Sequence, residues 1–301
     1  MVKESVFLSF LIALCMVNIC YGDGFCSSSA IAIWELTWDG EYGCFFVDIY
    51  VYVDGIYCVG SIRGDSGRDI YVLKCSLDGE VLWSRTIDMM DWDDGRAIFV
   101  SESYIYIAGC SRSITGDSDV YILKLDLEGG VVWNISWRGL GWDWAEDIYV
   151  YGDSVYVVGY TSSTQMSYVF ILKLDIDGNM LWNVTWSDGS PCSGSGIFVY
   201  NDSIYVVGHR YFMESSDVIV LEYDLEGNII AETYWMGGGD DRGYDIFVYG
   251  GDIYVVGYTD CMGLGRDVLL IKYDSSLNPI WNTTFGGNKD DEGRAISVYE
   301  D

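Results

Sequence analysis

Short apolar stretches rich in Tyr, Val and Ile alternate with clusters of Gly, Asp and Asn along most of the chain. This pattern predicts many short β-strands joined by turns. One stretch, Ile-Tyr-Val-Val-Gly and its variants, ends with a glycine at positions 60, 109, 159, 208 and 257, so its spacing is 49, 50, 49 and 49 residues. A tryptophan at positions 34, 83, 133, 182 and 281 marks the same period, with alanine in the slot at 231. The chain is therefore a tandem repeat.

Each repeat predicts four strands, named a to d in chain order. In the last full repeat, strand a covers 245–249, strand b 253–257, strand c 267–274 and strand d 280–285. Strands b and c are apolar on both faces, so both faces of their sheet must be covered by other layers. Four short strands in a period of this length are typical of a β-propeller, whose blades pack around an axis and cover one another.

The predicted fold is all-β, a β-propeller of four-stranded antiparallel blades with five full repeats and a partial sixth blade from the two chain ends. Residues 31–38 form a lone strand d, and the full repeats cover 39–88, 89–137, 138–186, 187–235 and 236–285. Residues 286–301 repeat only the d–a loop and strand a. Because the sixth blade would lack strands b and c, we expect an open or strained ring, or a truncated version of a longer protein.

The first 22 residues predict a cleaved signal peptide. Lys3 precedes an apolar run over 6–17, and small residues end the segment at Gly22. The run is short for a membrane span, although an uncleaved anchor is the alternative. A short segment, 23–30, leads into the propeller. We therefore expect a secreted or cell-surface protein with no membrane insertion after cleavage.

The chain is strongly acidic, with a formal net charge of −30 at pH 7. Such a field repels phosphate backbones and anionic lipids, which argues against nucleic-acid and peripheral membrane roles. Seven of the nine cysteines remain after signal cleavage, and no Cys-x-x-Cys pair occurs. Cys58 and Cys75 take apolar positions of the strand pattern, so we expect them in the core. The single histidine, His209, argues against a zinc site.

Two resemblances follow from the repeat. Residues 243–259 and 267–281 show best a pattern that resembles the secreted prokaryotic seven-bladed β-propeller repeats. This resemblance covers about residues 31–301 and implies a fold, but no activity. The strand-d motif at 174–182 looks like the tryptophan-docking motif of quinoprotein-type propellers, for which a quinone would be the cofactor.

One face of the propeller carries the predicted binding surface. Because strands alternate in direction, the d–a and b–c loops emerge together, and the b–c loops differ in every repeat, at 61–68, 110–118, 160–167, 209–216 and 258–266. Variable loops on a rigid scaffold are the usual place for recognition. The ligand-binding candidates on this face are Trp92, Trp142, Trp144, Tyr244, His209 and Arg210. Aromatic side chains beside acids suit sugar rings; packing between blades is the alternative.

Acids recur at one position of the d–a loops, where the repeats carry Asp93, Asp143, Asp241 and Asp291. The same slot holds Cys44 in the first repeat and Cys192 in the fourth. A ring of carboxylates predicts a Ca²⁺ site, since this hard cation prefers oxygen ligands. The alternative is that each aspartate accepts hydrogen bonds from its own loop.

No catalytic constellation emerges from the sequence. His209 could serve as a general base, but no motif assigns it a Ser, Asp or Cys partner. We therefore expect a non-enzymatic binding or scaffold module for an extracellular protein, a glycan or a cation, with no cofactor established. The alternative is an extracellular polysaccharide-acting or quinone-dependent enzyme.

Four Asn-x-Ser/Thr sequons mark candidate glycosylation sites, at Asn134, Asn183, Asn201 and Asn282. Three of them share one slot of strand d, so duplication of the repeat also explains them.

Overall fold

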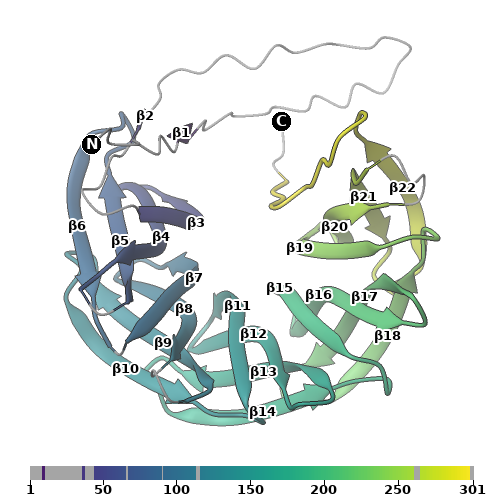
Figure 1. The fold of residues 1–301 in the computed structure, drawn as a ribbon, viewed down its shortest axis with the longest axis horizontal. Coiled ribbons are helices and arrows are strands. Elements are labelled where there is room, and N and C mark those ends of the chain that lie inside the picture. Colours follow the sequence, from purple (N-terminus) through teal and green to yellow (C-terminus); the bar gives the residue numbers. More distant parts are fainter. Residues whose placement is uncertain are drawn as a thin grey trace.

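The computed structural model describes residues 9–10, 36–37, 44–65, 67–89, 91–112, 116–260 and 265–298. These residues form an all-β fold of four-stranded antiparallel units arranged in an arc around a central axis, as Figure 1 shows. This arrangement confirms the predicted fold class. No helix in the described ranges is long and apolar enough to cross a membrane.

The described strands fall into five blades. Blade 1 contains β3 (Cys44–Tyr52), β4 (Gly55–Arg63), β5 (Arg68–Cys75) and β6 (Val81–Ile87). Blade 2 contains β7 (Trp92–Val100), β8 (Tyr104–Arg112), β9 (Ser118–Asp126) and β10 (Val131–Trp137). Blade 3 contains β11 (Trp142–Tyr151), β12 (Ser154–Ser162), β13 (Ser167–Asp175) and β14 (Met180–Trp186).

Blade 4 contains β15 (Cys192–Tyr200), β16 (Ser203–Phe212), β17 (Ser215–Asp224) and β18 (Ile229–Trp235). Blade 5 contains β19 (Asp241–Tyr249), β20 (Asp252–Thr259), β21 (Asp267–Tyr273) and β22 (Pro279–Phe285). The strands pair in chain order within each blade, and one parallel bridge, Arg68 with Trp92, joins blades 1 and 2. A separate short pair, β1 (Ser9–Phe10) with β2 (Leu36–Thr37), is antiparallel.

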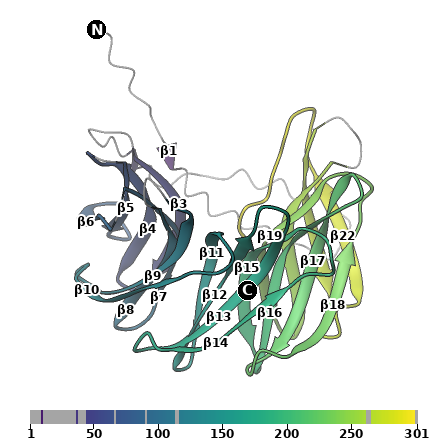
Figure 2. The same ribbon diagram turned by 60° about the horizontal axis from the view of Figure 1, so that its bottom comes forward.

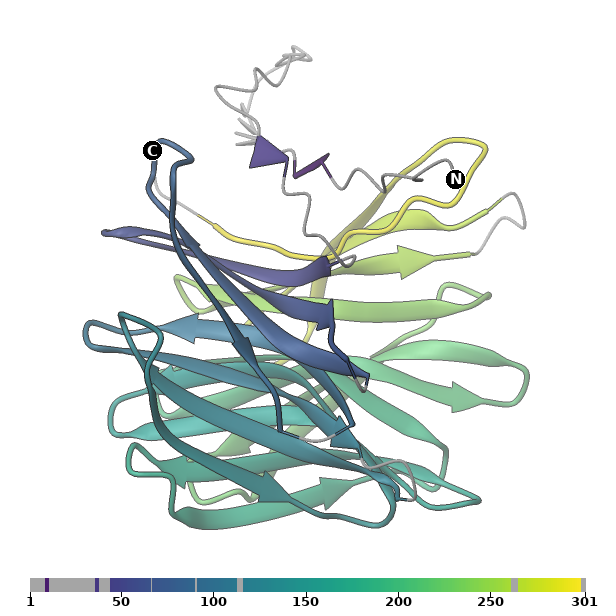
Figure 3. The same cartoon turned by 60° about the vertical axis from the view of Figure 1, so that its left-hand side comes forward.

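The chain after β22 continues the repeat along blade 5. The Gly293 amide donates to the Gly257 carbonyl at 3.1 Å, and the Ile296 amide donates to the Asp245 carboxylate at 2.8 Å. In Figure 3 this yellow segment runs beside the strands of blade 5. The number of blades in a complete ring stays a prediction. The predicted signal peptide and the lone strand d at 31–38 lie outside the described residues, apart from the short β1 and β2.

The core consists of the layers between blades. The two middle strands of blades 1 to 4 are largely buried on both faces, whereas one face of β21 in blade 5 is only partly buried. Each interface between blades contributes its own apolar cluster. Figure 2 shows neighbouring blades stacked face to face. Cys58 and Cys75 are buried in blade 1, as expected for small apolar residues. The core is therefore divided among the interfaces, and no blade can bury its middle strands alone.

Tryptophans of the outer strand dock blades 1, 2 and 3 onto the blade that follows. The indole Nε1 of Trp83 donates to the Leu127 carbonyl at 3.1 Å, and Trp133 donates to Ile176 at 3.0 Å. Trp182 makes the same bond to Leu225 at 3.1 Å. The receiving carbonyl lies in the c–d turn of the next blade, so the regular tryptophan spacing reflects blade docking.

One interface replaces the docking pair by a different pair. In the c–d turns of blades 2, 3 and 4 the glycine lies against the tryptophan of the preceding blade, so that a Cβ on Gly178 would be 3.1 Å from the Trp133 ring. Between blades 4 and 5 the tryptophan slot holds Ala231 and the glycine slot holds Leu277. Leu277 is 4% exposed and has a φ of 60°, a left-handed conformation that is strained for leucine. Its side chain fills the volume that an indole fills elsewhere, since both residues belong to one packed cluster.

Near the central axis, a second contact links alternate pairs of blades. Asp48, Asp147 and Asp245 each accept the amide of their following isoleucine at 2.7–2.8 Å and, at 2.8 Å, an isoleucine amide about 50 residues further on. The equivalent positions of the intervening repeats carry Ala97, Gly196 and Ala295, small residues beside which the incoming carboxylate can lie. The 49-residue unit thus alternates between two forms.

These carboxylates titrate unusually. Burial raises the pKa of Asp48 and of Asp245 to about 6, even though both accept backbone amides. Burial and then the charge of Asp245 raise the pKa of Asp147 well above its usual range. The three aspartates therefore favour the protonated form more in the folded than in the unfolded chain.

A double-substitution cycle tests the exchanged docking pair. Leu277→Gly alone leaves a cavity beside Ala231 and should cost about 2–4 kcal/mol, reduced by relief of the backbone strain. Ala231→Trp alone overpacks the same space and should cost about 1–3 kcal/mol. The double variant rebuilds the Trp133-type interface, so its loss of stability should be smaller than the sum of the two single losses. Chemical denaturation measures the three free energies, and simple additivity would contradict this account.

The inner aspartates predict a stability that falls with rising pH. Each folded-state pKa lies above the unfolded value, so their contribution is full below about pH 4 and is lost as pH rises to about 6 and beyond. For Asp48 and Asp245, a folded-state pKa of about 6 corresponds to roughly 3 kcal/mol each as an upper bound. His209 opposes this slope, since burial and then the charge of Arg242 lower its pKa to about 4.

Calorimetry between pH 4.5 and 7 checks this expectation. The wild-type Tm should decrease across that range, and Asp147→Asn should flatten the decrease whatever its absolute stability. Asp153→Asn, at an exposed turn, is the control and should keep the wild-type slope. A wild-type Tm that rises over the same range would refute the assignment.

Candidate functional site

Every innermost strand carries a β-bulge at the same place. The strand pairing shifts register between Gly95 and Ala97 in β7 and between Ala145 and Asp147 in β11, and the other blades repeat this. The extra residue of each bulge is, in chain order, Val47, Arg96, Glu146, Ser195 and Tyr244. Bulges re-aim side chains and are frequent next to functional sites.

The most regular sequence marker belongs to this bulge. The glycine that closes each Ile-Tyr-Val-Val-Gly stretch lies opposite the bulge in strand b. A Cβ on Gly159 would come within 1.9 Å of the Trp144 carbonyl oxygen, and the other four glycines meet the same obstacle at 1.8–2.0 Å. Glycine is needed at this slot because the bulged backbone approaches too closely for any side chain.

The side chains around the bulge differ between blades, whereas the framework around them repeats. Two positions change in size and charge from blade to blade: the bulge position itself and the position two residues before it. The second of these holds Asp94, Trp144 and Arg242 in blades 2, 3 and 5. We call these two sets of residues the bulge ring. A repeat that keeps its framework and varies one inner ring presents a surface for recognition.

Blades 2 and 3 join their bulge residues directly. Arg96 Nη2 lies 2.6 Å from Glu146 Oε2, and the Arg96 guanidinium lies 5.8 Å from the Trp144 ring. Trp144 stacks on Tyr160 with centroids 6.4 Å apart and planes 8° apart. The Nε atom of Arg96 is buried and has no hydrogen-bond partner among the described residues.

In blade 5, two tyrosines lie together, each beside an arginine. The rings of Tyr244 and Tyr258 are 5.7 Å apart, Arg294 lies 4.1 Å from the Tyr244 centroid, and Arg266 lies 4.5 Å from the Tyr258 centroid. These cation–π contacts hold both tyrosines in place.

His209 lies inside β16, so the prediction that it begins a loop is wrong. Burial lowers its pKa to about 4, with a further contribution from Arg242, so the imidazole is neutral at pH 7. Its Nδ1, together with Arg242 Nε and Asp260 Oδ1, is buried without a hydrogen-bond partner among the described residues. These orphaned atoms add unused hydrogen-bonding capacity at the loop-side ends of blades 4 and 5.

The predicted aromatic candidates also lie in strands, and the expectation of loop positions was wrong. Trp92 and Trp142 begin β7 and β11 and remain 43% and 42% exposed. Arg68 lies 4.7 Å from the Trp92 ring, and Arg112 lies 5.1 Å from the Trp142 ring. We call Trp92 and Trp142 the rim tryptophans.

A network of polar contacts fixes the first rim tryptophan. Trp92 Nε1 donates to Asp94 Oδ2 at 3.1 Å, and Asp94 Oδ1 accepts from Ser61 Oγ at 2.8 Å and from Arg68 at 3.4 Å. The indole is thus held in one orientation with part of its surface open.

Arg210 is already engaged within blade 4. It pairs with Asp188 and, at 3.2 Å, with Asp217, and its guanidinium stacks on Tyr234 at 4.0 Å. It is the least suited of the predicted candidates to meet a ligand.

The b–c connections of blades 1, 3 and 4 are shorter than expected because strand pairing continues into them. Arg63 still pairs with Arg68, and Phe212 still pairs with Ser215. In blades 3 and 4, whose b–c segments are fully described, the variable segments are therefore largely strand ends.

The four aspartates predicted to ring a calcium ion serve as loop clamps. Asp93 accepts the Met89 amide at 2.7 Å, and Asp143 accepts the Gly139 amide at 2.5 Å. The remaining two accept the equivalent amides, from Gly237 to Asp241 at 2.6 Å and from Gly287 to Asp291 at 3.0 Å. This geometry fits the hydrogen-bonding alternative, and the calcium ring stays a prediction.

Cys192 takes the clamp position in blade 4. Its Sγ donates to the Trp186 carbonyl at 3.2 Å. Burial raises the pKa of the thiol to about 11, so it is protonated at neutral pH and is not a nucleophile.

On the opposite face, the aspartates of the c–d turns form hydrogen bonds within their own turns. The c–d turn aspartates Asp175, Asp224 and Asp274 each accept amides of their own turn at 2.8–3.0 Å. These hydrogen bonds lower the pKa values of the three carboxyl groups, and those from Asn179, Asn228 and Asn278 have the largest effect. Turn chemistry accounts for these acids. The unusual chemistry gathers on the face where the innermost strands begin.

The four sequon asparagines are all exposed. Asn134, Asn183 and Asn282 lie on outer strands β10, β14 and β22, and Asn201 lies in an a–b turn. Neighbours such as Trp182 and Val184 point the other way, toward the adjacent blade. Glycosylation of these sites stays a prediction.

Comparisons with known proteins identify the fold. No protein-family model and no curated protein matches the sequence. Among solved structures, the chain is similar to a subtype N11 neuraminidase-like protein of A/flat-faced bat/Peru/033/2010 (H18N11), with a TM-score of 0.52 and 13% identity over 76% of this chain and 69% of that one. It is similar to a subtype N10 neuraminidase-like protein of A/little yellow-shouldered bat/Guatemala/060/2010, with a TM-score of 0.53 and 12% identity over 80% and 81%. An apocarotenoid oxygenase of Synechocystis matches with a TM-score of 0.51 and 11% identity over 80% and 61%. At these identities the likeness shows a propeller fold.

Proposed function

We propose that this protein is a secreted or cell-surface binding module without enzymatic activity, and that it binds a neutral glycan. The ligand would lie on the face where the innermost strands begin, with the rim tryptophans at its edge and the bulge ring toward the axis. Fold likeness to a neuraminidase-like protein and to an oxygenase does not choose between binding and catalysis, since one fold hosts many functions.

The observation that carries the proposal is the pair of rim tryptophans. Trp92 and Trp142 occupy the same slot of adjacent blades, each with an arginine on one side and about two fifths of its surface exposed. A flat indole held in place stacks on the apolar face of a sugar ring with little entropy left to lose. Nearby guanidinium and carboxylate groups can pair with sugar hydroxyls.

The charge of the chain favours a neutral ligand. With a formal net charge of −30, long-range repulsion opposes acidic polysaccharides as it opposes nucleic acids. Arg68 is paired with Asp94 and Arg96 with Glu146, so these two arginines are not free to form an anion site.

The state of the ionisable groups supports a non-enzymatic role. A general base works best with a pKa near the operating pH, whereas the pKa of His209 lies at about 4. Glu146 is paired with Arg96, and the clamp aspartates are committed to loop amides. The tryptophan motif that resembles quinoprotein propellers has a role in blade docking.

Substitution of the rim tryptophans tests the binding site. We expect a panel of neutral polysaccharides and oligosaccharides to quench or shift the intrinsic tryptophan fluorescence of the wild-type protein. Trp92→Ala and Trp142→Ala should each weaken the affinity about tenfold, which corresponds to roughly 1.4 kcal/mol. Tyr151→Ala, which removes an exposed aromatic at the end of β11 on the opposite face, is the matched control and should bind normally. Equal affinity in all four proteins would sink the proposed site.

Activity assays test the non-enzymatic part. The purified protein should leave the same polysaccharides unhydrolysed over days at pH 5 and pH 7, and a quinone with Ca²⁺ should change neither its absorbance nor its Tm. Hydrolysis that disappears in Glu146→Gln would identify a glycan enzyme instead.

A further inference from the structure

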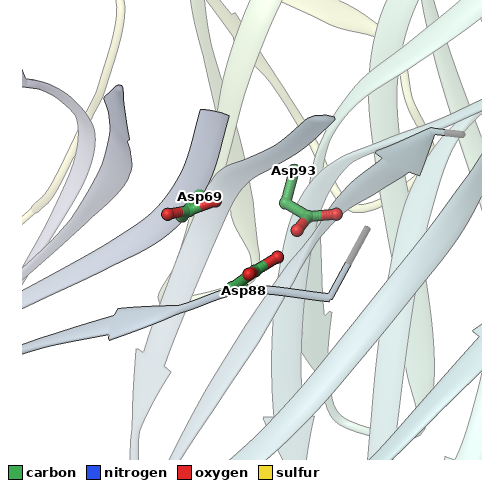
Figure 4. A group of neighbouring side chains, drawn as sticks. All are labelled: Asp69, Asp88 and Asp93. Carbon is green, nitrogen blue, oxygen red and sulfur yellow. The ribbon is translucent and has the colours of Figure 1, made fainter. Parts of the chain in front are cut away.

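Three carboxylates converge at the edge of blade 1, where β5 begins and β6 ends. Asp69, Asp88 and Asp93 each offer one oxygen, and these oxygens all lie within 4.8 Å of one another. Figure 4 shows the side chains approaching from β5, from the residue after β6 and from β7. Within the described ranges, no second group of three or more His, Cys, Asp or Glu side chains comes this close.

Asp69 is the member without a partner. It is only 8% exposed, and no described residue gives its carboxylate a hydrogen bond or an ion pair. Asp93, in contrast, accepts from the Met89 amide and from Ser111 Oγ. Burial, and then the charges of Asp88 and Asp93, raise the pKa of Asp69. A buried carboxylate that faces two other acids needs a neutralising charge.

Blade 2 shows what supplies that charge elsewhere. Asp119 occupies the position of Asp69, one residue before the first residue of strand c that pairs with strand d. Arg138 occupies the position of Asp88, one residue after the last residue of strand d that pairs with strand c. Arg138 Nε and Nη2 donate to both oxygens of the Asp119 carboxylate at 2.7–3.2 Å. The two blades differ by an acid in place of an arginine.

Blade 4 repeats the solution from another strand. Asp217 holds the same position, and Arg210 of β16 lies 3.2 Å from its carboxylate. In blade 5 the residue opposite Asp267 is Gly286, so the position of Asp88 carries no acid there. Blade 1 is thus the described blade in which this aspartate and two further carboxylates form one close group.

We propose that Asp69, Asp88 and Asp93 bind a divalent cation of the hard, oxygen-seeking class, such as Ca²⁺, which replaces the arginine of blade 2. Three carboxylate ligands and water would satisfy the oxygen coordination that this class requires. The bound ion would tie the end of β6 to β5 and to the first residues of β7. It would therefore stabilise the junction of blades 1 and 2, independently of any glycan.

Thermal unfolding of the full chain with Ca²⁺ alone as the probe tests the site. After removal of metals by a chelator, Ca²⁺ at about 100 times its Kd should raise the Tm by about 5–10 °C at constant ionic strength. Titration calorimetry should give one site per chain. An unchanged Tm together with no measurable heat of binding would overturn the proposal.

The blade comparison provides the decisive variant. Asp88→Arg rebuilds the pair of Asp119 and Arg138, so it should abolish the Ca²⁺ response and unfold at a higher temperature than the metal-free wild type. Asp88→Asn removes one ligand without new charge and should weaken the affinity for Ca²⁺ at least tenfold. Asp78→Arg, in an exposed c–d turn on the opposite face, makes the same charge change and should keep the full response.

Two outcomes would refute the site. If Asp88→Arg and Asp78→Arg respond to Ca²⁺ equally, the ion acts by screening the acidic surface. If Asp88→Asn keeps the wild-type affinity and stoichiometry, the ion binds elsewhere in the chain.

Discussion

Each blade must cover both faces of its apolar middle strands, and only neighbouring blades can do this. The interface is therefore the unit of stability, and its volume must be filled wherever the repeat varies. The pair Ala231 and Leu277 illustrates the constraint, because the loss of an indole is accompanied by a leucine in a backbone conformation that normally requires glycine. The strain at Leu277 persists because the surrounding cluster would otherwise contain a cavity.

The same constraint explains why the variable residues are separate from the residues that pack the blades together. Near the axis, bulges turn one residue per blade out of the regular pattern, and the glycine of strand b makes room for the bulged backbone. Residues such as Arg96 and Tyr244 can then vary without disturbing an interface cluster. On the opposite face, turn aspartates such as Asp175 are occupied by their own loops, which leaves that face chemically uniform.

The counter-charge of one recurring aspartate also differs between blades. The outer-edge aspartate is neutralised by Arg138 in blade 2 and by Arg210 in blade 4, whereas blade 1 places Asp88 beside Asp69. An exchange that removes a counter-charge at one blade indicates where an external ion would fit.

The sequence by itself determined the all-β class, the four strands of each blade and the face that carries variable residues. These features follow from local periodicity, since the glycine and tryptophan slots repeat every 49 or 50 residues and the apolar strands require two covering layers. The same reasoning could have found the alternation of Asp147 with Gly196, which is visible in the aligned repeats.

Only the tertiary structure decided what the individual polar residues do. Asp143 and Asp69 are both aspartates at recurring positions, yet Asp143 accepts a loop amide, whereas Asp69 faces one acid just after β6 and another in β7. His209 was expected in a solvated loop, but strand pairing extends past it and burial keeps it neutral. Hydrogen-bond partners and burial depend on residues about 20–50 positions away, and no local pattern in the sequence encodes that geometry.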